Sequence, residues 1–108
     1  MLAIDLINQI IPPLHPGDRA LRAIDWMDEY RVNQLPVVEE KKFIGLIDED
    51  VVFSSNDPDE PINSLLLKHQ NVFIDSQRHL FEVIKLALEH DLDVIPVVDE
   101  EESYLGVV

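Results

Sequence analysis

The strongest constraint on the fold of this chain is an internal repeat with an offset of sixty residues. The segment Leu-Pro-Val-Val-Glu-Glu at 35–40 recurs as Ile-Pro-Val-Val-Asp-Glu at 95–100. Further along, Phe-Ile-Gly-Leu-Ile at 43–47 matches Tyr-Leu-Gly-Val-Val at 104–108 with one extra intervening residue. Toward the N-terminus the same offset relates similar residues without a gap, in the pairs Leu14 and Ile74, Ile24 and Ile84, Glu29 and Glu89, and Val32 and Leu92. The chain is therefore two copies of one structural unit.

The hydrophobic period changes in the same order in both copies. Apolar residues recur with helical spacing over 20–30 and again over 80–87. Short β-branched runs follow at 35–38 and 95–98, each with a proline near its start, where a strand tolerates it best. A polar turn then leads to a second strand. The pattern predicts an α+β fold made of two β-α-β-β units.

Turn formers and chain composition mark the boundaries of these units. We expect a single module over 1–108, with repeat one at 3–55, a linker at 56–61 and repeat two at 62–108. Repeat two ends in its second hairpin strand, so it lacks the residues that follow that strand in repeat one. We therefore expect this sequence to be a fragment of a longer protein.

Shorter elements are predicted around the main helices. The apolar residues at 1–7 and 62–67 favour two short helices, and those at 48–53 favour a helical turn. Short polar side chains at 16–18 and 75–76 are expected to cap the two main helices, because they can accept hydrogen bonds from free backbone N–H groups.

The charge and the cysteine count exclude several classes of function. Only 8 Lys and Arg oppose 22 Asp and Glu, which gives a formal charge of −14 and repels nucleic acid and acidic lipid surfaces. The absence of cysteine removes disulfides, thiolate metal sites and thiol nucleophiles, and it suits a cytoplasmic location. No apolar run approaches the length of about 18 residues that a membrane span needs.

The main helices carry wide apolar arcs. On a helical wheel the arc over 20–30 runs from Trp26 to Leu21, and the second helix repeats it with Leu86 in the place of Trp26. A helix that covers only its own sheet needs a stripe of somewhat more than about 100°. The surplus predicts contact with the other repeat or with another subunit, so we expect a homodimer. The replacement of Trp26 by leucine favours packing over stacking on a ligand.

The doubled pattern of helix, Leu-Pro-Val-Val and Phe-Ile-Gly-Leu-Ile resembles a tandem pair of cystathionine-β-synthase (CBS) domains, or Bateman module, from about Ala3 to Val108. The resemblance implies two pseudo-symmetric β-α-β-β-α repeats packed through their sheets, the second of them truncated here. It also implies a regulatory role, in which AMP, ADP, ATP or S-adenosylmethionine binds between the repeats. The controlled domain would lie beyond residue 108 or on another chain.

The resemblance also points to ligand-contact residues. In the family a Ser or Thr follows the second hairpin strand and an Asp three residues later binds a ribose. Here Asp48 occupies the position of the Ser or Thr, and Val51 occupies the position of the ribose-binding Asp. The nearest aspartate, Asp50, lies one residue before that position. The candidate ligand-binding residues are His15, Leu35, Pro36, Val37, Asp48, Asp50, Asp75, Ser76, Arg78, Ile95, Pro96 and Val97. The residues beside each proline are either base contacts or plain core strands.

The remaining chemistry is sparse. The helix starts could attract a phosphate through free N–H groups and nearby cations, although these cations are also typical of a solvated helix face. The histidines His15, His69, His79 and His90 show no metal-ligand spacing, and no serine has a partner base. We therefore expect no catalysis and no metal. Two functions remain: an adenosine-nucleotide sensor, or a ligand-independent dimerisation or protein-interaction module.

Overall fold

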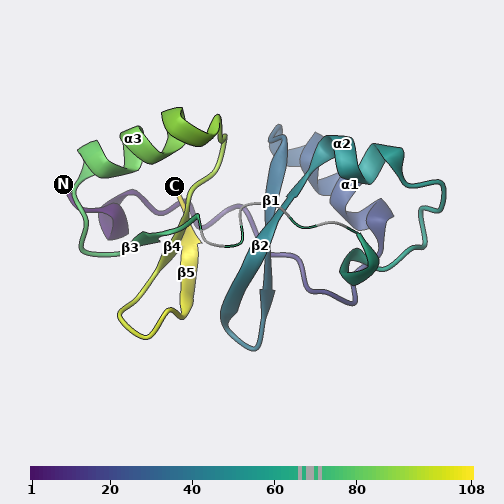
Figure 1. Cartoon of the computed structure of the whole chain (residues 1–108), viewed down its shortest axis with the longest axis horizontal. Coiled ribbons are helices and arrows are strands. Elements are labelled where there is room, and N and C mark those ends of the chain that lie inside the picture. The colour runs from purple at the N-terminus through teal and green to yellow at the C-terminus, as the bar shows by residue number, and fades with distance from the viewer. Residues whose placement is uncertain (66, 68–69, 71) are drawn as a thin grey trace.

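Two α/β units lie side by side along the long axis of the molecule in the computed structural model (Figure 1), which describes all residues except 66, 68, 69 and 71. The α-helices lie toward one side and the hairpin turns point to the other. The first half contains η1 (Ala3–Leu6), α1 (Ala20–Tyr30), β1 (Gln34–Glu39), β2 (Lys42–Asp48) and α2 (Glu49–Ser54). The second half contains η2 (Ile62–Ser64), β3 (Ile74–Asp75), α3 (Leu80–His90), β4 (Pro96–Val98) and β5 (Tyr104–Val107).

The two sheets repeat one topology. Strands β1 and β2 pair antiparallel, and Leu14 adds a parallel bridge to Val37. In the second sheet β4 and β5 pair antiparallel, and β3 adds the parallel pair between Ile74 and Val97. The two parallel pairs are sixty residues apart in the sequence. The pairing register of each hairpin also shifts at the same place, between Val37 and Val38 in the first and between Val97 and Val98 in the second. The predicted pair of pseudo-symmetric units is confirmed.

The main helices end alike but do not begin as predicted. Arg31 and Asp91 both adopt the left-handed conformation, which closes each helix with a backbone hydrogen bond to the preceding turn. The N-cap residues are Arg19 and His79, so the prediction that short polar residues at 16–18 and 75–76 cap the helices is wrong. Only His79 caps with its side chain, through ring Nδ1 and the Phe81 N–H at 3.1 Å.

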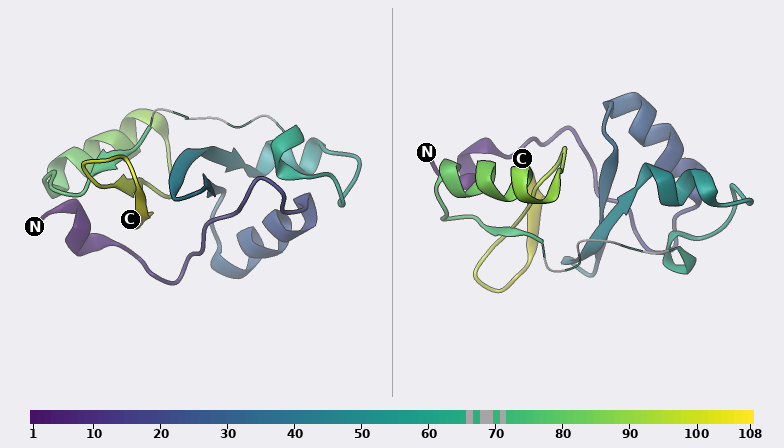
Figure 2. Two further views of the ribbon diagram at one scale, coloured as in Figure 1. Left: turned by 90° about the horizontal axis from the view of Figure 1, so that it is seen from below. Right: turned by 45° about the horizontal axis from the view of Figure 1, so that its top comes forward.

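The short helical turn that begins each repeat packs into the hydrophobic core of the other repeat. Ala3 of η1 is buried in the core of the second sheet, and its N–H donates to the Arg78 carbonyl at 2.7 Å. Conversely, Ile62 of η2 is buried against α1 and β1, with its N–H bound to the Asp18 carbonyl at 2.8 Å. Figure 2 shows the start of the chain running along the second unit before it enters the first. The exchange fastens the repeats together, because neither core is complete without the other repeat.

The shorter elements depart from the predicted lengths. The predicted helix at 1–7 is a single 3-10 turn at Ala3–Leu6, and the one at 62–67 is a turn at Ile62–Ser64, with Leu66 outside the described residues. After η1 the Asn8 N–H, which a continuing helix would use within the segment, donates to the Val107 carbonyl of the opposite repeat at 2.7 Å. The predicted helical turn at 48–53 is confirmed as α2. Among the described residues, repeat two has no counterpart of α2.

Candidate ligand-binding site

The residues predicted to contact an adenine lie inside the two sheets. In β1, Leu35, Pro36 and Val37 are all less than 2% exposed, and in repeat two Ile95, Pro96 and Val97 reach at most 2%. Their backbone is also occupied. The Pro36 carbonyl accepts the Leu14 N–H at 2.8 Å, and Ile95 exchanges two hydrogen bonds with Val108. These residues build the cores from which a site would be presented.

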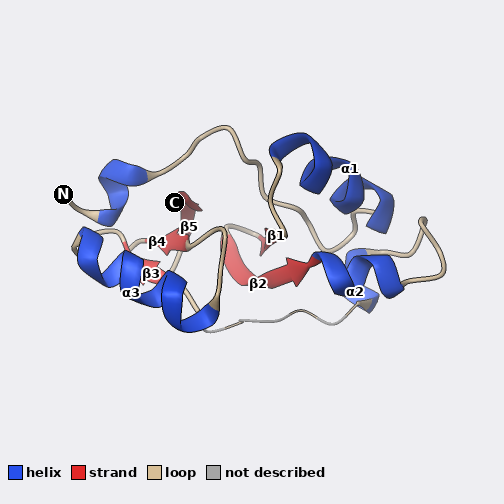
Figure 3. Cartoon of the chain, turned by 90° about the horizontal axis from the view of Figure 1, so that it is seen from above, coloured by secondary structure: helices blue, strands red, loops and turns tan. Residues whose placement is uncertain are grey.

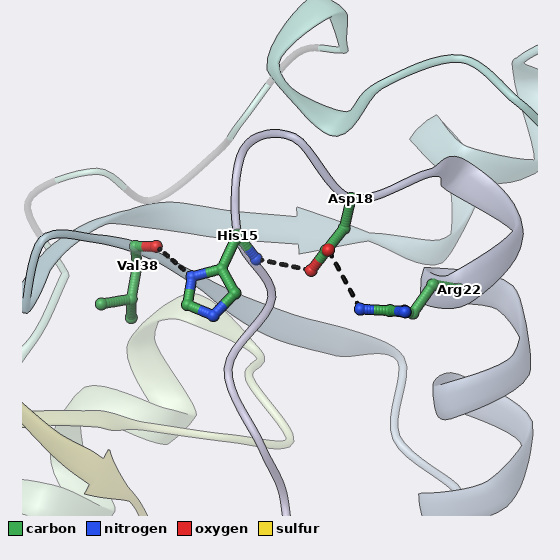
Figure 4. Close-up of polar contacts among 4 residues, drawn as sticks. All are labelled: His15, Asp18, Arg22 and Val38. Carbon is green, nitrogen blue, oxygen red and sulfur yellow. Dashed lines mark hydrogen bonds and ion pairs between the residues drawn. The ribbon is translucent and has the colours of Figure 1, made fainter.

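The turn before α1 holds a connected polar network (Figure 4). The His15 N–H donates to the Asp18 carboxylate at 2.8 Å, and the same carboxylate accepts from the Arg22 guanidinium at 3.1 Å. Ring Nδ1 of His15 lies 3.2 Å from the Val38 carbonyl oxygen. Because a carbonyl only accepts, this contact requires the proton on Nδ1. The network fixes the orientation of His15 and joins the start of α1 to the end of β1.

The histidine ring replaces a backbone bond that repeat two retains. In repeat two the Ser76 N–H donates to the Val98 carbonyl at 2.9 Å. The equivalent of Ser76 in repeat one is Pro16, which has no N–H, so the Val38 carbonyl would lack that donor. The His15 ring supplies it. His15 thus has a structural task in addition to its predicted role in ligand binding.

The equivalent turn before α3 places the predicted residues of repeat two. The Asp75 carboxylate accepts the Gln77 N–H at 2.9 Å, and Ser76 is buried at 5% exposure. The Arg78 side chain is 63% exposed and lies 3.7 Å from Glu82. Asp75 and Arg78 line one groove of about 400 Å³ along α3, together with Phe73, Lys85 and Leu86. Sequence reasoning did not identify Phe73, which precedes the short strand β3 and gives no periodic signal.

The N–H groups at the helix starts are not free, contrary to the expectation of a phosphate site there. In α1 the Ala20 N–H donates to the Glu60 carbonyl at 2.8 Å, and the Leu21 N–H donates to the Pro58 carbonyl at 2.9 Å. In α3 the Leu80 N–H donates to the Met1 carbonyl at 3.0 Å. The segment that leads into the opposite repeat satisfies these donors, so a phosphate would have to compete with it.

The altered ribose position lies at the start of α2. Asp48 is the N-cap residue of this helix and pairs with Gln34 across the hairpin. Asp50 is exposed, and its carboxylate accepts the N–H of Val51 at 2.9 Å. His15 lies beside Val38, at the other end of β1. Gln34, which pairs with Asp48, and Val38, which contacts His15, are four positions apart along β1, a distance of about 13 Å. The structure therefore does not bring Asp48 and His15 into direct contact.

A clasp between the repeats was not identified from the sequence. The Asn33 N–H donates to the Asp93 carboxylate at 3.0 Å, and the Asp93 N–H donates to the Gln34 side-chain oxygen at 2.9 Å. The Asn33 carbonyl also accepts the Glu49 N–H at 2.9 Å. Asn33 and Asp93 are sixty residues apart and each follows a helix end, which is the signal that could have revealed them. Through Asn33, the clasp links repeat two to the start of α2.

A second inter-repeat contact joins the hairpin turns. The Lys42 ammonium donates to the Glu101 carbonyl at 2.5 Å, and the Tyr104 N–H donates to the Lys41 carbonyl at 2.7 Å. In addition, Leu46 of β2 is fully buried within the core of the second repeat. The two repeats are thus joined at both ends of their shared interface, and a ligand bound between them would act on both.

The linker is fastened by one carboxylate. Glu60 accepts hydrogen bonds from the Ser55 hydroxyl at 2.5 Å and the Ser64 hydroxyl at 2.8 Å. The Ser55 bond, followed by the Ser64 bond, lowers the pKa of Glu60. The ionised side chain therefore stabilises the segment at 58–60. Carbonyls of this segment accept the first N–H groups of α1.

Metal-binding clusters and membrane spans were sought over the same residues. The described part of the chain contains no cluster of three or more His, Cys, Asp or Glu side chains suited to a metal ion, while His69 lies outside it. No helix in this part is long and apolar enough to cross a bilayer.

Comparison with known proteins explains the doubled architecture. A family model described as the CBS domain matches twice, at residues 3–54 and 62–108. Inosine-5'-monophosphate dehydrogenase from Aquifex aeolicus is 27% identical over 106 residues, which are 94% of this chain and 22% of the enzyme. The enzyme of the same name from Bacillus subtilis is 27% identical over 88% of this chain and 20% of its own length. The chain therefore spans about a fifth of these relatives.

Solved structures share the fold at lower identity. A CBS domain pair/ACT domain protein from Thermotoga maritima has a TM-score of 0.91 at 22% identity, over all of this chain and 88% of that one. CBSX2 in complex with AMP has a TM-score of 0.79 at 16% identity, over 99% of this chain and 88% of that one. The cytosolic domain of the Mg²⁺ channel MgtE in complex with ATP has a TM-score of 0.73 at 19% identity, over 98% of this chain and 48% of that one.

Proposed function

This chain belongs to the CBS domain family, and from that premise we propose that it is a non-catalytic regulatory module that binds an adenosine nucleotide or S-adenosylmethionine between its repeats. The observation that carries the proposal is the double family match on two repeats joined by reciprocal contacts. Two neighbours of the same fold are complexes with AMP and ATP, which supports an adenosine ligand. The cytoplasmic location remains a prediction.

The way in which the repeats are joined supports a role in the control of another domain. The exchanged segments and the clasp make the position of each repeat depend on the other. A ligand that favours one arrangement of the repeats shifts the population toward it in proportion to its difference in affinity. The relatives in which this chain matches only about a fifth of the length support an attached or partner domain as the controlled element.

Calorimetric titration of the purified chain with AMP, ADP, ATP and S-adenosylmethionine tests the proposal. Binding heat and a higher thermal midpoint with at least one of them are expected, because a ligand that binds only the folded state stabilises it. Neither heat nor a thermal shift from any of the four at millimolar concentration would refute nucleotide sensing by this chain.

A matched pair of variants tests the predicted site in repeat two. Arg78→Ala should weaken binding about tenfold or more if the guanidinium contacts a phosphate, because a hydrogen bond to a charged group contributes about 1.5–3 kcal/mol. Lys41→Ala removes an equal charge from the exposed β1–β2 turn, outside this groove, and should change affinity little. Equal effects of both variants would indicate long-range charge alone and argue against a phosphate contact at Arg78.

Self-association is the second candidate function. Several large apolar side chains on the helices remain exposed, namely Leu21 at 46%, Phe53 at 62%, Phe81 at 73%, Ile84 at 45% and Leu88 at 78%. A helix surface of this kind is typical of a protein interface. The change from the family pattern at Asp48 and Val51 favours this function over nucleotide binding in repeat one. A homodimer without ligand is the expected state.

A further inference from the structure

The backbone donors at the starts of the two main helices are engaged within the chain. In α1 the N–H groups of residues 20–22 donate to carbonyl oxygens at 2.8–3.0 Å. In α3 the N–H groups of Leu80 and Glu82 donate to carbonyl oxygens, and that of Phe81 donates to the His79 ring. A phosphate that binds at a helix start is held by N–H groups of this kind. Neither helix start therefore offers its first three donors to a ligand.

The Lys and Arg side chains on these helices, and in the turns before them, are paired with carboxylates. Arg22 lies 3.1 Å from Asp18, as Figure 4 shows, and Arg78 lies 3.7 Å from Glu82. Two further pairs complete the set, Arg19 with Asp59 at 3.4 Å and Lys85 with Glu89 at 3.9 Å. An exposed ion pair is weak, but it places a negative charge beside the cation that a phosphate would use. A phosphate contact at Arg78 would thus require its pair with Glu82 to open.

The two helices do not supplement each other. Figures 1 and 3 both show α1 and α3 in opposite units, so the cations of one helix do not lie beside the start of the other.

Further carboxylates lie at the predicted ribose position and at the start of α1. Asp48, Glu49 and Asp50 follow one another at the start of α2, and Asp48 occupies the position of a neutral hydroxyl in the family pattern. The segment at 57–60, which covers the start of α1, contains three more acidic residues. The formal charge of the whole chain, −14, does not offset these groups. A phosphate would therefore meet repulsion at both places, whereas a cation would be attracted.

We propose that this module selects adenosyl ligands whose 5′ substituent is neutral or cationic, and that it discriminates against AMP, ADP and ATP. The ligand class is then adenosine, its 5′-thioethers and the sulfonium S-adenosylmethionine. This inference rests on the proposed function, the binding of an adenosine ligand between the repeats, and it specifies which ligands are selected. The adenosyl group provides the affinity, and the charge of the 5′ substituent decides between ligands.

The selection should depend on ionic strength. The phosphate of AMP carries about two negative charges at neutral pH, and adenosine carries none. The Debye length falls from about 30 Å at 0.01 M to about 3 Å at 1 M salt, so salt screens the repulsion between a phosphate and exposed carboxylates. Added salt should therefore raise the affinity for AMP and ATP, lower that for S-adenosylmethionine and leave that for adenosine nearly unchanged.

Isothermal titration of the full chain with adenosine, AMP, ATP and S-adenosylmethionine tests the selection, in EDTA and at about 0.02 M and about 0.5 M sodium chloride. At low salt we expect S-adenosylmethionine to bind most tightly, AMP no more tightly than adenosine, and ATP roughly tenfold more weakly than adenosine. The differences should shrink at high salt. AMP or ATP binding tenfold more tightly than adenosine, or an ATP affinity that falls with salt, would overturn this inference and leave the proposed function in place. Binding of none of the four, adenosine included, would overturn the proposed function itself.

A matched pair of variants tests whether the carboxylate beside Arg78 disfavours phosphate. Glu82→Gln frees the guanidinium and should raise the affinity for AMP about threefold or more, with that for adenosine unchanged. Glu100→Gln removes an equal charge from the exposed β4–β5 turn and should change the ratio of the two affinities little. An unchanged ratio in Glu82→Gln, or an equal change in both variants, would overturn the local repulsion on which the inference rests. Far-UV circular dichroism and the thermal midpoint confirm that each variant is folded.

Discussion

The hydroxyl of Tyr104 in β5 should cost the protein stability. Its oxygen is buried, and it has no hydrogen-bond partner among the described residues. The ring itself packs against the core of the second repeat. A buried hydroxyl that loses its hydrogen bonds to water costs about 1–3 kcal/mol. Tyr104→Phe removes only that atom and keeps the packed ring, so it should raise the free energy of unfolding by a similar amount.

The predicted gain is large enough to measure in two ways. At neutral pH the thermal midpoint should rise by about 4 °C for each kcal/mol, given a chain of this size. At high pH the parent should lose stability, because burial raises the pKa of Tyr104 above its ordinary value of 10.0. The folded state then keeps a proton that the unfolded chain releases, so the free energy of unfolding falls by about 1.4 kcal/mol per pH unit above pH 10.

The assay is urea unfolding at pH 7 and at several values between pH 9.5 and 11. The chain has two tyrosines, so Tyr30→Phe is the matched control and leaves Tyr104 as the one phenol observable by absorbance. Tyr104→Phe should be more stable at pH 7 and should lose less stability than the parent above pH 10. A variant that is less stable at pH 7, or one with the same loss at high pH as the parent, would refute the reasoning.

Three further substitutions probe how the repeats are joined. Leu46→Ala, at a fully buried site in the second core, should lower the free energy of unfolding by about 2–5 kcal/mol in urea. Gly106→Ala places a Cβ 2.5 Å from Ile7 Cγ2, so it should destabilise the chain, and Ile7→Ala in the same chain should recover part of the loss by calorimetry. Asp93→Ala removes the acceptor of the Asn33 N–H, which should cost about 1 kcal/mol and speed hydrogen exchange at that amide.

The sequence alone determined the repeated architecture and most of its regular elements. The sixty-residue offset and the change from helical to strand periodicity predicted α1, α3, both hairpins and α2, because burial of one helix face and one sheet face requires that pattern. The family also followed from the sequence, since two short motifs at a constant offset are far more specific than one. The wide apolar arcs likewise agree with the exposed Leu21, Ile84 and Leu88.

Only the tertiary structure decided which segments complete which core and which polar groups meet. The exchange of Ala3 and Ile62, the Asn33–Asp93 clasp and the occupied N–H groups of the helix starts all join residues about forty to eighty positions apart. Such contacts depend on the relative placement of two folded units, which local periodicity does not encode. The contact of the His15 ring with the Val38 carbonyl has the same origin. It stands where the backbone N–H of Ser76 binds the Val98 carbonyl in repeat two, because Pro16 has no N–H.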